Sequence, residues 1–178
     1  MKQDMKYLDT ANLTEWVSTL RAGEEIRLSG TVYTARDAAH KKIVQAITEG
    51  KALPFPLAGS AIYYAGPTPA MGGLAVGSAG PTTSSRMDPY LPRLTALGQL
   101  LTIGKGDRSE EVYRALQEHG GAYLCAIGGA GALCAEHIES AEVIAYPELG
   151  CESVKRFVFR EMPLYVGIDS IGGSIFKK

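Results

Sequence analysis

The sequence predicts an α/β domain in which helices flank a sheet core. Segments with strand-like and helix-like apolar spacing alternate through the first two thirds of the chain, and strand-like segments dominate the last third. A chain of 178 residues is long enough to bury a single large core. We therefore expect residues 1–178 to form a single domain.

Five segments combine helical apolar spacing with residues that begin or end helices. In residues 35–49, Ala39, Ile43 and Ile47 recur at helical spacing, and Gly50 can end the helix. Ser109 can cap another helix. The predicted helices are residues 12–23, 35–49, 89–98, 109–120 and 132–138.

The predicted strands are short runs rich in apolar residues, many of them followed by glycine. Residues 25–34 alternate apolar and polar side chains, as a half-buried strand does. Residues 51–59 contain Pro54 and Pro56 and are predicted to form a loop or an edge segment. The predicted strands are residues 25–34, 60–66, 73–77, 99–106, 122–127, 141–146, 156–160, 164–169 and 173–176.

The balance of charge argues against polyanionic partners. Eighteen basic and nineteen acidic side chains leave a net charge of -1, so we expect neither a nucleic acid nor an anionic membrane as a partner. The first twelve residues contain no apolar run, and no stretch reaches the roughly 20 apolar residues that cross a bilayer. We expect a soluble, cytoplasmic protein.

The three cysteines are widely spaced and form no Cys-x-x-Cys pair. Three thiols could in principle hold an iron–sulfur cluster. However, Cys125 lies in an apolar run and Cys134 in an alanine-rich segment, where cysteine usually behaves as a small buried apolar residue. The third, Cys151, stands apart from both.

Known nucleotide-binding motifs are broken. Residues 129–131 would need a third glycine where Cys134 stands, and Lys105 is followed by Gly106 rather than by serine or threonine. The chain therefore contains neither a dinucleotide fingerprint nor a Walker loop.

Residues 77–90 form the stretch with the most chemical potential. Gly80 and Pro81 favour a tight turn, and residues 82–85 are hydroxyl side chains that can begin a helix. The positive end of such a helix favours an anion, and Arg86 follows Thr82 by about one turn. The alternative is a capped turn with a surface arginine.

Three cations follow predicted strands in separate loops. Arg36, Arg86 and Lys105 would meet if these loops converge at the carboxyl ends of the strands. Such a pocket would suit a small dianion, most simply a dicarboxylate. Arg36 could instead form a local surface ion pair with Asp37, and His40 could serve either in an acid–base relay or as a hydrogen-bonded structural residue.

Six motifs together resemble the β subunit of class I, iron–sulfur fumarate hydratase. This subunit corresponds to the C-terminal domain of single-chain class I fumarases, and its family includes the L-tartrate dehydratase β subunit. The resemblance runs from about residue 20 to the C-terminus in one unbroken order. The motifs are SGTVYTARDAAH (29–40), YAGP (64–67), GPTTSSRMD (80–88), GKG (104–106), AIGG (126–129) and YPELG (146–150).

The resemblance implies a swivelling β/β/α domain and a hydro-lyase that converts fumarate reversibly to (S)-malate, a reaction of the tricarboxylic acid cycle. It also implies a [4Fe-4S] cluster held by three cysteines of an α subunit and not by this chain. The active site would then lie between α and β subunits, in an α2β2 assembly. Because this chain lacks the cluster-bearing domain, it should be inactive alone.

Site residues are carried over motif by motif. The resemblance implies that Arg36, Arg86 and Lys105 bind the substrate carboxylates together with Thr82 and Thr83. It offers Thr82 as the proton-transferring residue, with Arg36 and Lys105 also catalytic. A threonine hydroxyl is a poor base, so Thr82 would need the nearby cations to stabilise its alkoxide. The resemblance implies that Asp37 and His40 contact the substrate-binding residues rather than the substrate, and that His40 orients Arg36 or a backbone carbonyl.

Two departures from the family pattern lie outside this set: Asp107 replaces an expected asparagine, and residues 130–131 replace a Pro-Ala pair. Residues 107–109 and 119–121 resemble fumarases more than tartrate dehydratases, so the resemblance favours fumarate over tartrate as the substrate. The alternatives are an L-tartrate dehydratase β subunit, which would convert L-tartrate to oxaloacetate, and a non-catalytic dicarboxylate-binding domain.

Overall fold

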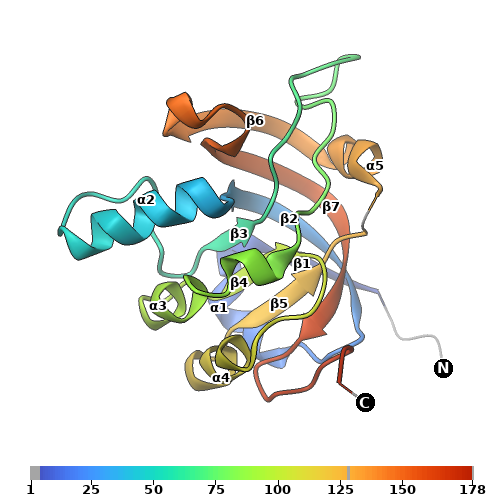
Figure 1. Ribbon diagram of the computed structural model, residues 1–178. Helices are drawn as coiled ribbons and strands as arrows, with labels where there is room; N and C mark the ends of the chain where they lie inside the picture. Colours follow the sequence, from blue (N-terminus) through green and yellow to red (C-terminus); the bar gives the residue numbers. More distant parts are fainter. Residues whose placement is uncertain (1–4, 128, 178) are drawn as a thin grey trace.

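A computed structural model describes residues 5–127 and 129–177 and confirms the mixed α/β class (Figure 1). One sheet of seven strands has the order β1-β2-β3-β4-β5-β7-β6, and β2 also pairs with β7. The strands are β1 (Lys6–Asp9), β2 (Glu25–Thr34), β3 (Ala61–Tyr63), β4 (Leu101–Gly104), β5 (Ala122–Cys125), β6 (Ile138–Ala145) and β7 (Val154–Ile168).

The extra pairing closes the sheet into a small barrel. β2, β3, β4 and β5 run parallel to their neighbours, and β7 lies antiparallel to both β5 and β2. β1 and β6 add to the edges that β2 and β7 leave free. The described residues therefore form a five-stranded ring with one additional strand on each of its two longest members.

Alternation along the strands separates the barrel interior from the outer layers. Tyr63 and Leu124 point into the main core inside the barrel. Their neighbours Ile62 and Tyr123 face the opposite side and pack in two further apolar clusters. Because successive side chains of a strand point to opposite faces, strands this short can be buried on both sides once helices cover the outside.

The helices of the structure agree with the predicted helical segments. Residues 12–23 contain only short helical turns, whereas α2 and α4 are regular helices. α2 packs over one outer cluster and α4 over the other, and α3 contributes Leu94 to the first and Leu91 to the second. The helices are α1 (Leu13–Trp16), α2 (Asp37–Thr48), α3 (Leu91–Ala96), α4 (Glu110–His119) and α5 (Gly131–Glu136), with 3₁₀ turns η1 (Thr10–Asn12), η2 (Val17–Thr19), η3 (Ser84–Met87) and η4 (Pro147–Glu152).

Two predicted strands are wrong. Residues 73–77 lie in a protruding loop, because Gly72 and Gly73 adopt positive φ angles of 62° and 79° and turn the chain back on itself. Residues 173–176 form only an isolated bridge between Ile168 and Ser174. The segment lies beside the end of β7, where the Ile175 N–H donates a 3.0 Å hydrogen bond to the Gly167 carbonyl, but the pairing does not extend into a ladder.

Two further differences concern strand limits. The predicted strands 156–160 and 164–169 are one continuous strand, β7, in which Glu161 has a positive φ of 49°. The four-residue strand β1 lies in a stretch for which no element was predicted. The AIGG motif (126–129) includes residue 128, which lies outside the described residues.

Among the helices of the described residues, none combines the length and the apolar character needed to cross a lipid bilayer.

Candidate functional site

The site begins where three parallel strands end side by side. β2, β3 and β4 are consecutive neighbours in the sheet, so their carboxyl ends lie along one edge. The chain continues from these ends into Arg36, Gly66 and Lys105. The sheet thus brings the loops that carry Arg36 and Lys105 together with the loop that follows β3.

The loop of residues 77–90 lies across these strand ends and is held there by its backbone. The Thr82 N–H donates a 2.7 Å hydrogen bond to the carbonyl of Tyr64, just beyond β3. Thr83 forms a parallel bridge with Lys105, just beyond β4. Thr82, which is half-buried, and the exposed Thr83 and Lys105 are therefore neighbours in space.

Arg86 is joined to the first turn of α2. Its guanidinium forms an ion pair with the carboxylate of Asp37, although the two residues are 49 positions apart. The Arg86 side chain remains 51% exposed. The local pair considered between Arg36 and Asp37 is not what the structure contains, because Asp37 pairs with Arg86 instead.

Arg36 lies against a glycine and a second carboxylate. A Cβ on Gly66 would stand 2.8 Å from Arg36 Nη1, so only glycine leaves space for this side chain. The nearest carboxylate oxygen is Glu152 Oε1, 3.8 Å from Arg36 Nε. Both atoms are buried and have no hydrogen-bond partner among the described residues. The two atoms face each other at slightly more than hydrogen-bond distance, and the Arg36 side chain as a whole is 23% exposed.

Glu152 was absent from the predicted site. It lies in η4, two positions after the YPELG motif, and that proximity is the only sequence signal for it. Arg36 and Glu152 are far apart in the chain, so the sequence does not indicate that they are in contact.

His40 is buried beneath the site and faces aromatic rings. Its Nδ1 lies 2.8 Å from the Arg36 carbonyl, which can only accept, so Nδ1 carries the hydrogen. Its ring packs against Tyr64 and Tyr90 at centroid distances of 5.5 and 5.6 Å. Burial lowers the pKa of His40 to about 4, so the ring is neutral at pH 7. This arrangement suits a residue that orients the Arg36 backbone better than an acid–base relay.

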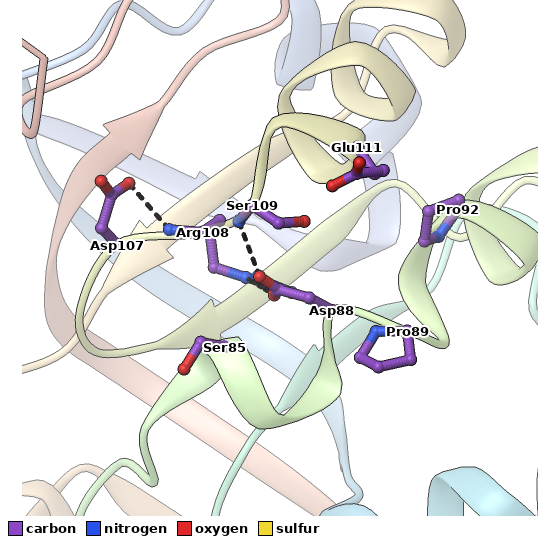
Figure 2. A pocket seen from close by; sticks show the side chains of 8 residues that line it. All are labelled: Ser85, Asp88, Pro89, Pro92, Asp107, Arg108, Ser109 and Glu111. Carbon is purple, nitrogen blue, oxygen red and sulfur yellow. Dashed lines mark hydrogen bonds and ion pairs between the residues drawn. The ribbon is translucent and has the colours of Figure 1, made fainter.

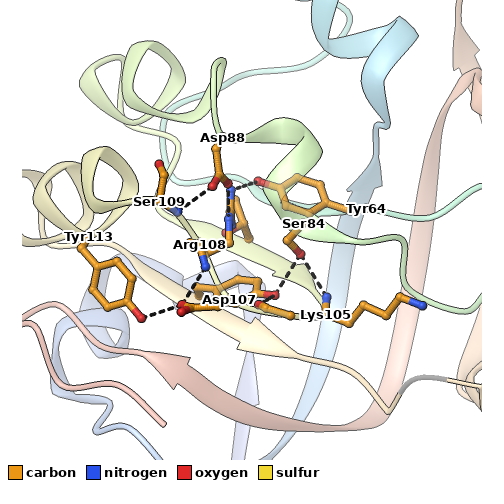
Figure 3. A network of polar contacts seen from close by, with 11 residues as sticks. Tyr64, Ser84, Asp88, Lys105, Asp107, Arg108, Ser109 and Tyr113 are labelled. Atoms are coloured by element: carbon orange, nitrogen blue, oxygen red, sulfur yellow. Dashed lines mark hydrogen bonds and ion pairs between the residues drawn. The ribbon is translucent and has the colours of Figure 1, made fainter. Parts of the chain in front are cut away.

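A buried polar network under the loop was not predicted (Figure 3). The Arg108 side chain is fully buried, and its Nε donates a 2.6 Å hydrogen bond to Asp88 Oδ1. Its other nitrogens reach Thr102 Oγ1 at 3.4 Å and the Tyr64 hydroxyl at 3.2 Å. An arginine that follows an aspartate in a polar segment resembles a surface residue, so sequence offered little signal for it.

Next to this network lies a cavity of about 660 Å³, between η3, α3 and the start of α4 (Figure 2). Its lining residues are Ser85, Asp88, Pro89, Pro92, Asp107, Arg108, Ser109 and Glu111. None of the predicted site residues lines it. The candidate site lies instead along the sheet edge, where Arg86 and Lys105 are exposed and Arg36 is half-buried.

The part of the chain that the structure describes contains no group of three or more His, Cys, Asp or Glu placed to hold a metal ion. Cys125 is half-buried at the end of β5, Cys134 is buried in α5, and Cys151 is exposed in η4. The thiols occupy three different environments, so these residues do not fit a cluster held within this chain.

Comparison with known proteins identifies a family and its members. A family model described as "Fumarase C-terminus" matches residues 2–178. The chain is 39% identical over 155 residues to "Fumarate hydratase class I, aerobic" of Escherichia coli (strain K12), an alignment that covers 86% of this chain and 28% of that protein. It is also 39% identical over 164 residues to "Fumarate hydratase 2" of Leishmania major, covering 91% and 29% of the two chains.

Another relative matches the chain in length. "Putative L(+)-tartrate dehydratase subunit beta" of Methanocaldococcus jannaschii is 36% identical over 168 residues, covering 91% of this chain and 86% of that protein. The chain thus spans less than a third of the fumarate hydratases and most of this subunit. These relatives confirm the resemblance drawn from the six motifs, and the match over residues 2–178 shows that the chain belongs to the Fumarase C-terminus family.

Proposed function

We propose that the chain is the β subunit of a class I fumarate hydratase, which hydrates fumarate reversibly to (S)-malate. The observation that carries this proposal is the grouping of Arg36, Thr82 and Lys105 at the carboxyl ends of adjacent strands. Arg86 joins this group through Asp37. Relatives named fumarate hydratase support the choice of reaction.

In this proposal the cations bind the two carboxylates of the substrate. Removal of the proton from carbon moves negative charge onto the adjacent carboxylate, so Arg36, Arg86 and Lys105 stabilise the transition state more than the ground state. The hydroxyl of Thr82 moves that proton. The same cations favour its alkoxide, and the Thr82 backbone is already held by Tyr64.

The proposal requires a partner. The described residues do not supply a ligand set for a [4Fe-4S] cluster, so the cluster would be held by an α subunit in an α2β2 assembly. The open edge of the candidate site is compatible with a partner that covers it. In this proposal the chain is a swivelling β/β/α domain of the complex. The reaction belongs to the tricarboxylic acid cycle, and the complex is located in the cytoplasm.

L-tartrate dehydratase is the second candidate, because the relative that matches this chain in length carries that name. Both reactions add or remove a molecule of water, and both act on a dicarboxylate. Turnover of (S)-malate and of L-tartrate by the same purified complex separates them.

The test begins with purification of the tagged chain from its own cells. We expect it to retain a cluster-bearing partner, and the complex to hydrate fumarate. Recovery of the chain without such a partner, and without turnover of either substrate, would support a non-catalytic dicarboxylate-binding domain instead.

The variant Arg86→Ala tests the site within that complex. It should lower kcat/KM by at least about 100-fold, because an Arg contact to a substrate carboxylate is worth several kcal/mol. The matched control is Arg93→Ala, an exposed arginine on α3, which should retain normal turnover. Circular dichroism checks that both variants fold, and full activity of Arg86→Ala would refute the assignment.

A further inference from the structure

Ser84 connects the two loops that carry the proposed catalytic groups (Figure 3). It is completely buried at the start of η3. Its N–H donates a 3.0 Å hydrogen bond to the Lys105 carbonyl, and the Lys105 N–H donates another of 3.0 Å to Ser84 Oγ. One residue therefore holds both backbone groups of Lys105.

Tyr123 of β5 extends this contact to the next residue. Its hydroxyl lies 2.9 Å from Ser84 Oγ and 2.8 Å from the Gly106 carbonyl. A carbonyl can only accept, so the single phenol hydrogen goes to Gly106, and the Ser84 hydroxyl donates to Tyr123. The hydrogen bonds then run in one direction from Lys105 N–H through Ser84 and Tyr123 to Gly106.

The surroundings leave this relay little freedom. A Cβ on Gly104 would stand 1.9 Å from Ser84 Oγ, so the serine is pressed against the end of β4. The Arg108 guanidinium lies over the Tyr123 ring at 4.8 Å from its centroid. Burial raises the pKa of Tyr123 well above its ordinary value, which keeps the phenol protonated and able to donate.

We propose that Ser84 is a positioning residue that sets the placement of Lys105 relative to Thr82, and that Tyr123 holds it in place. Thr82 is two residues before Ser84 and is itself held by Tyr64, so the serine couples the hydroxyl and the ammonium through a short, rigid backbone path. A misplacement of about 1 Å is enough to cost a large factor in rate. This inference rests on the proposed function, because its effect is read in turnover.

The first test is the amide exchange of Lys105, measured by NMR in the full chain without substrate. Ser84→Ala should increase the exchange rate of this amide by about 10-fold or more, because it loses its acceptor. Ser85→Ala is the matched control, since Ser85 is the exposed neighbour in the same turn, and it should leave the rate unchanged. An unchanged Lys105 amide in Ser84→Ala would overturn the inference regardless of activity.

The second test is turnover of fumarate by the complex with its partner. Ser84→Ala should lower kcat by about 10- to 100-fold with KM within about threefold, and Tyr123→Phe should lower it less, because the phenylalanine keeps the ring under Arg108. The double variant should lose no more than Ser84→Ala alone, since both substitutions break the same relay.

The outcomes separate the inference from the proposed function. An active wild-type complex in which Ser84→Ala matches Ser85→Ala, or in which the losses of the two single variants multiply, would overturn the positioning role. A wild-type complex without turnover of fumarate, malate or L-tartrate would overturn the proposed function, and the role in turnover with it.

Discussion

At the scale of single residues, a buried ion pair between Arg108 and Asp88 supports the loops of the candidate site. Arg108 and Asp88 form an ion pair whose side chains are 0% and 9% exposed. Burial alone would lower the pKa of Arg108, but the attraction of Tyr64 and Asp88 outweighs it and raises this pKa. The second Asp88 oxygen accepts from the Ser109 N–H at 2.6 Å, so the pair also ties α4 to the loop before α3.

Substitution of Asp88 by Asn should destabilise the fold by about 3–5 kcal/mol, because it leaves the Arg108 charge buried without its counter-charge. Urea unfolding measures the change. The control is Glu142→Gln, which breaks an exposed pair with Arg156 and should cost less than about 1 kcal/mol. Equal losses in the free energy of unfolding for the two variants would show that the buried ion pair contributes no more to stability than the exposed one.

His40 predicts a pH dependence whose sign follows from its burial. Its pKa falls to about 4 from an ordinary 6.5, so between these values the unfolded chain binds a proton that the folded chain does not. The free energy of unfolding should therefore decrease as the pH falls from 6.5 to 4, by about 3 kcal/mol in total from this residue.

The measurement is urea unfolding between pH 4 and pH 7 in the wild type and in His40→Asn. The carboxylates titrate in both proteins, so the difference between the two curves isolates the histidine. That difference should change across this range, and parallel curves would contradict the assignment.

At the scale of elements, the turn from β4 to α4 uses its two glycines for different reasons. Gly104 is buried, and a Cβ there would meet Ser84 Oγ at 1.9 Å and Tyr64 Cδ2 at 2.9 Å. Gly106 has a φ of 81° but no neighbour within 4 Å of the position a Cβ would take. Lys105 thus lies between a glycine required by packing and a glycine required by backbone conformation.

The two glycines should therefore respond differently to alanine. Gly104→Ala should cost about 3 kcal/mol, because the buried loop around Ser84 must move. Gly106→Ala should cost only about 1 kcal/mol, the strain of an L residue in the left-handed region. Thermal unfolding of both variants gives the comparison, and a larger loss in Gly106→Ala would contradict the packing argument.

At the scale of the whole molecule, β2 and β7 are the strands on which the barrel depends. β2 is paired with β7 on one edge and with β1 and β3 on the other. β7 is likewise paired with β2 on one edge and with β5 and β6 on the other. Opening this ribbon would break the ring, whereas β1 and β6 can detach without doing so.

Native-state hydrogen exchange should reveal this hierarchy. Amides in the β2–β7 ladder, such as those of Val32 and Phe157, should exchange only through global unfolding. Their exchange rates should be at least about 100-fold lower than those of β6 amides that are not hydrogen-bonded to β7. Faster exchange in the β2–β7 ladder than in β6 would indicate that the barrel opens along this seam.

Local patterns predicted much of the fold and the members of the candidate site. The limits of β2 agree with the alternation of residues 25–34, and α2 and α4 follow from helical spacing and terminal glycines. The cations and the run of hydroxyl residues stood out because glycine and proline mark their loops, whereas the roles given to Thr82 and Thr83 came from the family resemblance. These are properties of neighbouring residues, so the sequence alone determined them.

Only the tertiary structure decided what depends on residues far apart in the chain. Closure of the barrel by β7, the pairing of β1 and the absence of a strand at 73–77 depend on whether a partner edge is available. The pairing of Asp37 with Arg86 and the contacts of Ser84 with Lys105 and Tyr123 likewise join distant segments. Backbone and buried polar groups form hydrogen bonds with whichever partners the fold brings close to them. Those partners can be far away in the chain, so the spacing of residues in the sequence does not predict them.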